Sequence, residues 1–225
     1  MGTWIPLLVI KEKELLEKRS KLGTNPPIVV AIGGLSGTGK DTLSNRILER
    51  INSDYGIQLQ KYNAGDFIRE LAVKNGFPPE DLDKFVDKVK DEPGFSRKVD
   101  IFIEEQTLTK AIEGGGIFTG RMAPFTIGNH GFTVFLKADP LVIANRLVND
   151  ENRAEYGCQE EQVARKIRKR DKADIERLKR VYSINFEKLL EKVDLVLDTC
   201  QLTIEESVEK IFSEFKKKFS LSNQE

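Results

Sequence analysis

Short apolar runs alternate along the chain with longer stretches of helical periodicity. The clearest run is Ile28–Ile32, five consecutive apolar residues of which four are β-branched. Such a run is typical of a strand that is buried on both faces of a parallel sheet. Five strands separated by helices predict an α/β fold, a three-layer sandwich around a five-stranded parallel sheet. The other four strands are predicted at Leu59–Asn63, Ile117–Thr119, Phe132–Leu136 and Leu195–Leu197.

Stretches in which apolar residues recur every three to four positions predict the helices. The first covers 5–22, with Pro6 near its start and Gly23 as its stop. The last begins near Thr203, where Glu206 provides the partner of a capping box. The helices between them are predicted at 41–52, 67–75, 79–90, 96–112, 140–149 and about 160–180.

Two segments interrupt the alternation of strands and helices, 66–113 and 150–172, and we expect both to be mobile inserts. They belong to a single predicted domain that spans 28–219. Residues 1–27 form an N-terminal helical extension, with a linker at its end, and 220–225 form a tail. The sequence leaves open whether the N-terminal helix packs on the core, mediates dimerisation or is poorly ordered.

Composition narrows the classes of partner. The chain has 225 residues, with 36 Lys and Arg against 36 Asp and Glu, so it lacks the basic field of a nucleic-acid-binding protein. No apolar run approaches the ~20 residues that span a membrane. Cys158 and Cys200 are far apart, which predicts no disulfide framework and a cytoplasmic protein, and neither neighbours His130 to suggest a zinc site. We expect a monomer or weak dimer.

A glycine-rich loop, GLSGTGK, follows the strand Ile28–Ile32 and leads into a predicted helix. A strand that turns through glycines into a helix makes a nest of backbone N–H groups that binds phosphate. The lysine at its end reaches toward the β- and γ-phosphates of a nucleotide. The loop therefore predicts an ATP site built from Gly34, Ser36, Gly37, Thr38, Gly39, Lys40, Asp41 and Thr42.

Asp41 departs from the usual pattern of this loop, which places Ser or Thr directly after the lysine to bind Mg²⁺. Thr42 follows one position later. We favour Asp41 as a cap at the helix N-terminus, and the alternative is that it holds a magnesium-bound water. The sequence does not identify the Mg²⁺ ligands. We expect the ATP phosphates to hold most of the ion, with Asp41 or Thr42 as candidate protein ligands.

Arginines at two turns are expected to face this loop, because phosphoryl transfer depends on positioning and on positive charge near the transferred oxygens. Asp66, as a helix cap, and Arg69 follow the second predicted strand. Arg121 follows Gly120 at the carboxyl end of the third strand, where ligands bind in parallel sheets. These turns predict clamps for an acceptor phosphate.

A third group lies in the arginine-dense helix at about 160–180. Arg170, Asp174 and Arg177 stand at i, i+4 and i+7 and share one helical face. Two arginines that flank a carboxylate can grip a phosphate and a sugar hydroxyl together. A solvated basic face is the alternative for some of the arginines in this helix.

With these motifs the chain resembles the cytidylate kinase family, closest to its compact archaeal-type members. The resemblance runs from residue 28 to about residue 212. It rests on GLSGTGKDT, AGDFIREL and TGR, and more specifically on RDKADIER and VDLVLDTCQLTIEESVEKI. Nucleoside monophosphate kinases often have a small residue and then Thr after the loop lysine, so the order Asp41-Thr42 fits that group better than it fits GTPases.

The resemblance implies the P-loop nucleoside monophosphate kinase fold and the reaction of ATP with CMP or dCMP. Residues 66–113 would be the acceptor-binding insert and 150–172 a short lid. The implied catalytic residues are Lys40, Arg121, Arg153 as the lid arginine, and Arg170. The implied acceptor-binding residues are Asp66, Arg69, Arg121, Arg170, Asp174 and Arg177.

The sequence leaves the acceptor base open. Thr119 stands where the family often has Glu. Asp100 and Gln106 are candidates for reading the cytosine edge, with a solvent-facing position as the equal alternative. The acceptor could also be AMP, UMP or a small alcohol. A different class of function, an ATPase or regulatory module without an acceptor, would use an acid such as Asp139 for Mg²⁺, and Arg121 favours the kinase over it.

Overall fold

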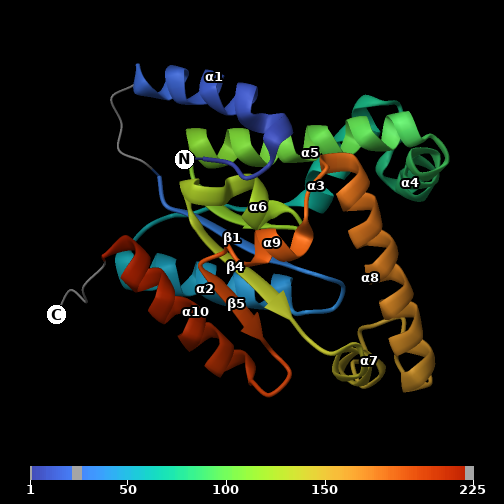
Figure 1. The fold of residues 1–225 in the computed structure, drawn as a ribbon. Coiled ribbons are helices and arrows are strands. Elements are labelled where there is room, and N and C mark those ends of the chain that lie inside the picture. Colours follow the sequence, from blue (N-terminus) through green and yellow to red (C-terminus); the bar gives the residue numbers. More distant parts are fainter. Residues whose placement is uncertain (1, 22–26, 221–225) are drawn as a thin grey trace.

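The computed structural model describes residues 2–21 and 27–220, and it contains the predicted five-stranded parallel sheet (Figure 1). The strand order is β2-β3-β1-β4-β5. Near the end of β1, Ile32 pairs with Thr119 of β3 and Gly34 pairs with Leu136 of β4, so the carboxyl ends of these strands lie side by side. The strands are β1 (Val29–Gly34), β2 (Lys61–Asn63), β3 (Gly116–Thr119), β4 (Phe132–Lys137) and β5 (Leu195–Asp198).

The long predicted helices are present, with shifted ends. The structure adds the short helices α6 and α9, which are only five residues long and therefore leave no helical period in the sequence. The predicted helix stop at Gly23 and the linker residues Thr24–Pro26 lie outside the described residues. The helices are α1 (Val9–Ser20), α2 (Lys40–Tyr55), α3 (Ala64–Lys74), α4 (Leu82–Asp91), α5 (Pro93–Glu113), α6 (Ala123–Ile127), α7 (Pro140–Val148), α8 (Glu160–Tyr182), α9 (Phe186–Leu190) and α10 (Ile204–Phe219).

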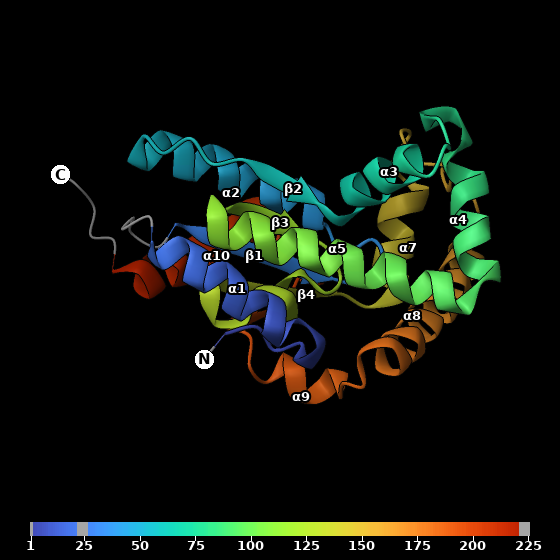
Figure 2. The same ribbon diagram turned by 90° about the horizontal axis from the view of Figure 1, so that it is seen from above.

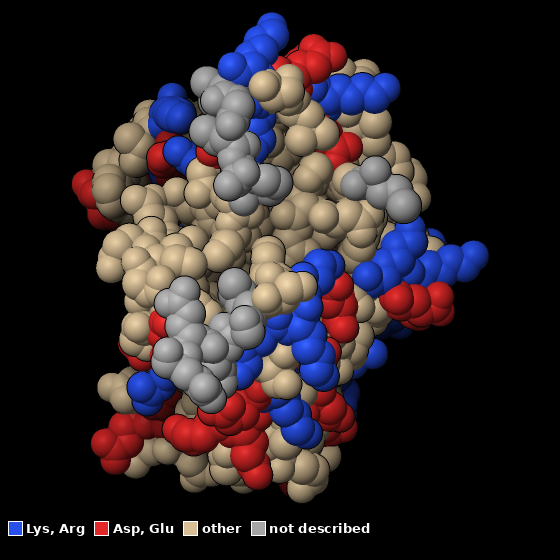
Figure 3. Space-filling view, turned by 90° about the vertical axis from the view of Figure 1, so that its left-hand side faces the viewer, with Lys and Arg blue, Asp and Glu red and all other residues tan. Residues whose placement is uncertain are grey.

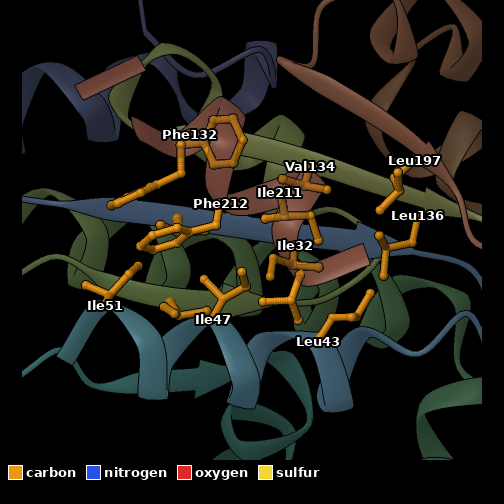
Figure 4. Close-up of a cluster of buried hydrophobic side chains, with 14 residues drawn as sticks. Ile32, Leu43, Ile47, Ile51, Phe132, Val134, Leu136, Leu197, Ile211 and Phe212 are labelled. Carbon is orange, nitrogen blue, oxygen red and sulfur yellow. The ribbon is translucent and has the colours of Figure 1, made fainter. Parts of the chain in front are cut away.

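One face of the sheet packs on α2 and α10 (Figure 4). Val30 and Ile32 of β1 point to this side, because alternate residues of a strand face the same way. The side chains that meet them from the two helices are Leu43, Ile47, Ile51, Val208, Ile211, Phe212 and Phe215. Thr203 and Glu206 form the predicted capping box at the start of α10.

The opposite face of β1, with Val29 and Ala31, packs on α5 and α6 and completes the three layers. The N-terminal helix α1 lies along α5 in both ribbon views (Figures 1 and 2). Leu8 and Leu15 are buried with Leu108 of α5 in one cluster. Of the three alternatives for this helix, the structure therefore favours packing on the core.

The segment 66–113 carries an apolar cluster of its own. Phe67 of α3 and Phe85 of α4 are buried against the first half of α5. In Figure 2, α3, α4 and the start of α5 project beyond the sheet on the side of α8. This arrangement suits an insert at the carboxyl edge of the sheet, while the bounds of both inserts stay predictions. The predicted lid boundary at 172 falls inside α8, which runs unbroken to Tyr182.

The surface mixes both signs of charge. On the face shown in Figure 3, Lys and Arg side chains lie next to Asp and Glu around an uncharged central area. Within the described residues, no helix combines the length and the apolar character needed to cross a membrane.

Candidate active site

The glycine loop connects the end of β1 at Gly34 to the start of α2 at Lys40. Gly37 and Gly39 have φ angles of +71° and +86°, which side chains with a Cβ rarely adopt. A Cβ on Gly37 would also stand 2.3 Å from Cγ2 of Ile143 in α7. The glycines therefore satisfy two demands here, a left-handed turn and the close approach of α7.

Lys40 folds back over the loop. Its Nζ donates a hydrogen bond of 2.7 Å to the carbonyl oxygen of Leu35. Burial, followed by the nearby charge of Arg121, lowers the pKa of Lys40 to about 8. The loop thus holds a poorly solvated ammonium group that an anionic ligand would stabilise.

A pocket of about 500 Å³ opens beside the loop and is the candidate site for the phosphoryl donor. Besides Gly37–Leu43, its walls include Arg153 of the predicted lid and Arg146 at the end of α7. Arg146 donates a hydrogen bond to the carbonyl oxygen of Thr199, which ties α7 to the segment after β5. We did not predict Arg146 from the sequence, where it is one arginine of an ordinary amphipathic helix.

A larger pocket of about 570 Å³ lies on the other side of the loop, between β4, α8 and α9. Most of its walls are apolar, with side chains such as Phe135, Ile143 and Ile175. Of the loop it borders only Leu35 and Thr38. The smaller pocket, which contains Lys40 and the backbone amides around it, is therefore the better candidate for the donor phosphates.

Arg121 joins three elements at the carboxyl end of β3. One guanidinium nitrogen lies 2.7 Å from Oδ2 of Asp174 in α8, and it also donates a hydrogen bond of 3.3 Å to Oγ of Ser36 in the glycine loop. Within the described residues the buried Asp174 oxygen accepts no hydrogen bond, so charge attraction links it to Arg121. Burial lowers the pKa of Arg121. The predicted convergence of β3, α8 and the loop is present.

Two further carboxylates, Asp100 and Asp171, neutralise this arginine cluster. Arg177 forms a hydrogen-bonded ion pair with Asp100 of α5, which is only 9% exposed. The solvent-facing alternative for Asp100 is therefore wrong, because the insert folds α5 against α8. Oδ1 of Asp171, which we did not single out, accepts a hydrogen bond of 3.3 Å from the backbone N–H of Ser36. Arg170 itself is exposed, although its charge acts on Arg121.

Arg69 and Asp66 form an exposed ion pair in the first turn of α3. Asp66 is not the N-cap that we predicted. Asn63 caps the helix, and its side-chain oxygen accepts a hydrogen bond of 2.7 Å from Gly65 N–H. Asp66 instead accepts a hydrogen bond of 3.3 Å from Asn63 N–H, which completes a capping box. The helix starts earlier than predicted because Asn63 has the extended backbone of an N-cap and its side chain binds the first turn.

Asp41 is also not a cap, since the N-cap of α2 is Gly39. Its carboxylate lies in the first turn and faces β2, where it contacts Lys61 and Asn63. Thr42 lines the donor pocket. The described residues contain no cluster of three or more acidic, histidine or cysteine side chains that would hold a metal by themselves.

The structure also contains a buried acid that the sequence analysis missed. Glu104 of α5 accepts a hydrogen bond from the hydroxyl of Thr126 in α6. Burial raises the pKa of Glu104 to about 7. It lies one turn after Asp100, and this spacing, which places the two acids on one face of α5, was the available signal. Asp139, the magnesium candidate of the regulatory-module alternative, caps α7 through a hydrogen bond of 2.7 Å from Leu141 N–H.

Comparisons with known proteins identify the family of the chain. A family model described as cytidylate kinase matches residues 106–217. A cytidylate kinase from Methanopyrus kandleri is 30% identical over 190 residues, which cover 80% of this chain and 89% of the relative. One from Methanocaldococcus jannaschii is 27% identical over 182 residues and covers 79% and 92% of the two chains.

Among solved structures, a shikimate kinase from Bacteroides thetaiotaomicron has a TM-score of 0.54 at 18% identity, covering 86% of this chain and 99% of that one. This likeness shows the fold alone. The identity and coverage of the archaeal relatives decide the family. The chain belongs to the cytidylate kinase family.

Proposed function

We propose that this protein is an ATP-dependent kinase that transfers the γ-phosphoryl group of ATP to CMP or dCMP and forms ADP and CDP or dCDP. The observation that carries the proposal is the contact between Arg121 and Ser36. It brings an arginine at the end of β3 against the loop that would hold the ATP phosphates. A donor site and an anion-binding acceptor site therefore share one edge of the sheet.

The acceptor phosphate would bind Arg121 and Arg69, with Arg170 and Arg177 on the same side. Asp174, Asp100 and Asp171 neutralise part of this cluster without ligand. An incoming phosphate replaces Asp174 at Arg121, and the released carboxylate can then accept a hydrogen bond from a sugar hydroxyl. The exchange keeps the arginine paired in both states, which limits the cost of desolvation.

On the donor side, Lys40 and the loop amides would bind the β- and γ-phosphates. Arg153 pairs with Asp150 in the pocket wall and would turn onto the transferred group when the lid closes. Mg²⁺ supplies charge neutralisation between the phosphates when bound. Thr42, which lines the donor pocket, is the side chain that we propose for it.

We also propose a cytoplasmic location. Cys158 and Cys200 are both free thiols, as expected in a reducing compartment. A monomer or weak dimer stays our prediction for the oligomeric state.

The test is a coupled ADP-release assay with CMP, dCMP, UMP and AMP as acceptors. We expect CMP and dCMP to be preferred, and Lys40→Ala to remove the activity. ATP turnover that is equally fast without an acceptor would support the regulatory or ATPase function instead. A preference for AMP over CMP of more than about tenfold, roughly 1.4 kcal/mol in transition-state binding, would leave only the fold assignment standing.

A further inference from the structure

A single side-chain amide bridges the donor loop helix and the acceptor insert. Nδ2 of Asn63 donates a hydrogen bond of 3.1 Å to Oδ1 of Asp41, the second residue of α2. Oδ1 of the same amide accepts the hydrogen bond of 2.7 Å from Gly65 N–H that caps α3. Only the oxygen of an amide accepts and only its nitrogen donates, so the two contacts fix its orientation.

Lys61 holds Asp41 on this side. Its Nζ lies 3.5 Å from Oδ1 of Asp41 and donates a hydrogen bond of 2.8 Å to Oδ1 of Asn45 in the next turn of α2. Lys61 and Asn63 are two residues apart in β2 and therefore project to the same face of the strand. The carboxylate of Asp41 thus faces two hydrogen-bond donors from one strand, Lys61 and Asn63. A Ser or Thr hydroxyl at this position would carry no negative charge to pair with Lys61.

The line of contacts continues to the acceptor arginine. Asp66 accepts a hydrogen bond from the backbone N–H of Asn63 and pairs with Arg69. Asp41 is therefore connected to Arg69 through two intervening residues, Asn63 and Asp66. A second contact between the donor loop and the acceptor arginines runs from Arg121 to Ser36.

We propose that Asp41 is a positioning residue that sets the distance between the donor loop and Arg69 through Asn63. This rests on the proposed function, since it assigns Arg69 to the acceptor phosphate. It explains why an acid follows the loop lysine here: the carboxylate orders the start of α3. The Asp41 side chain is 68% exposed, so its loss shifts the acceptor geometry without unfolding the domain.

The test exchanges donor and acceptor between the two positions. Asn63→Asp keeps a strong N-cap but removes the amide donor and places two carboxylates together. We expect it to raise KM for CMP about tenfold while KM for ATP stays within about twofold. A tenfold change is about the size expected for the loss of one hydrogen bond to a charged group. Asp41→Asn keeps an acceptor oxygen and costs less, about twofold to threefold.

The double variant Asp41→Asn with Asn63→Asp restores the pair in reverse, because the amide at position 41 donates to the carboxylate at position 63. We expect its KM for CMP to return to within about threefold of the unchanged protein. No rescue, together with an increased Mg²⁺ requirement in Asp41→Asn at saturating ATP, would overturn the proposal and assign Asp41 to the metal.

Amide hydrogen exchange of residues 64–69 gives a readout that does not depend on the acceptor. Asn63→Asp should accelerate exchange in this first turn of α3, and the double variant should restore it. Exchange that is equal in all three proteins would contradict the link even if CMP were a good acceptor. Failure of the unchanged protein to phosphorylate CMP, with exchange behaving as expected, would overturn the function and leave the link.

Discussion

The donor and acceptor sides of the site are built in different ways. The proposed donor side is one continuous segment, 34–42, in which backbone amides and Lys40 would bind the phosphates. The acceptor side takes arginines from α3, the end of β3 and α8, and balances them with carboxylates from α5 and α8. Local geometry therefore makes the first, and tertiary packing makes the second.

The charges on the two sides are also handled differently. Arg121 and Arg177 each form an ion pair with a carboxylate, whereas the ammonium group of Lys40 donates a hydrogen bond to a backbone carbonyl oxygen. We expect the proposed acceptor side to exchange one anion for another when its ligand binds. The donor side carries a charge that burial disfavours until a nucleotide arrives.

The largest expected effect comes from Arg121→Ala, which would show that the acceptor side can be impaired without weakening the binding of ATP. We expect kcat/KM for CMP to fall by about 10²–10³-fold, because a buried arginine near the transferred phosphoryl group acts on the transition state. KM for ATP should change by less than about threefold. Steady-state kinetics with each substrate varied in turn provide the measurement.

Arg121→Lys is the matched control for this variant. It retains the charge but not the planar guanidinium group that can bind a phosphate through two parallel N–H groups, so its loss of activity should be intermediate. An equal rise of both KM values in Arg121→Ala would mean that the two sides act as one site, and the comparison would fail.

A smaller effect is expected from Glu104→Gln, which tests whether a buried acid next to the acceptor side makes the stability of the protein depend on pH. Burial raises the pKa of Glu104 in the folded protein to about 7, against the ordinary 4.5. The stability that protonated Glu104 retains is therefore full below about pH 4.5 and is lost as the pH rises through 7. The variant removes this loss. Its stability relative to wild type should be greater at about pH 8 than at about pH 5 by up to about 3 kcal/mol.

Urea denaturation at the two pH values provides the measurement. Glu113→Gln, at the exposed end of the same helix, is the control and should show no such difference. Since the amide oxygen introduced by Glu104→Gln can still accept the hydrogen bond from Thr126, packing is retained. A stability difference that does not change with pH would show that Glu104 titrates normally.

The same contrast explains what could be predicted from the sequence. Buried strands, long helices and the glycine loop depend on neighbours in the chain, so Ile28–Ile32 and Gly34–Lys40 were informative by themselves. Arg121 could be singled out because a Gly-Arg turn at a strand end has a fixed place in a parallel sheet. The fold and the donor side followed from such local signals.

The partners on the acceptor side could not be predicted in this way. Asp100 meets Arg177 and Asp171 meets Ser36 across 77 and 135 residues of sequence. No local pattern specifies which acid an arginine will meet at such separations. Asp41 illustrates the same limit, because its carboxylate meets Asn63 of β2, 22 residues further along the chain. The short helix α6 was missed because five residues carry too little periodicity.

The smallest expected effect is a pH dependence that should appear on the donor side alone. Because the pKa of Lys40 is lowered to about 8, the ammonium form becomes the minority above that pH in the free protein. ATP binding favours the charged form, so KM for ATP should rise toward tenfold for each pH unit above about 8. KM for CMP should change little over the same range, because the acceptor arginines stay protonated.

Initial rates between about pH 7 and pH 9.5, with CMP saturating, test this expectation. Lys40→Arg is the control, since a guanidinium keeps its charge throughout the range and should flatten the profile of KM for ATP even if activity falls. Parallel profiles for the two substrates would mean that another group titrates at both sites. A profile confined to ATP would locate the titrating charge in the loop, where no carboxylate forms an ion pair with Lys40 among the residues that the structure describes.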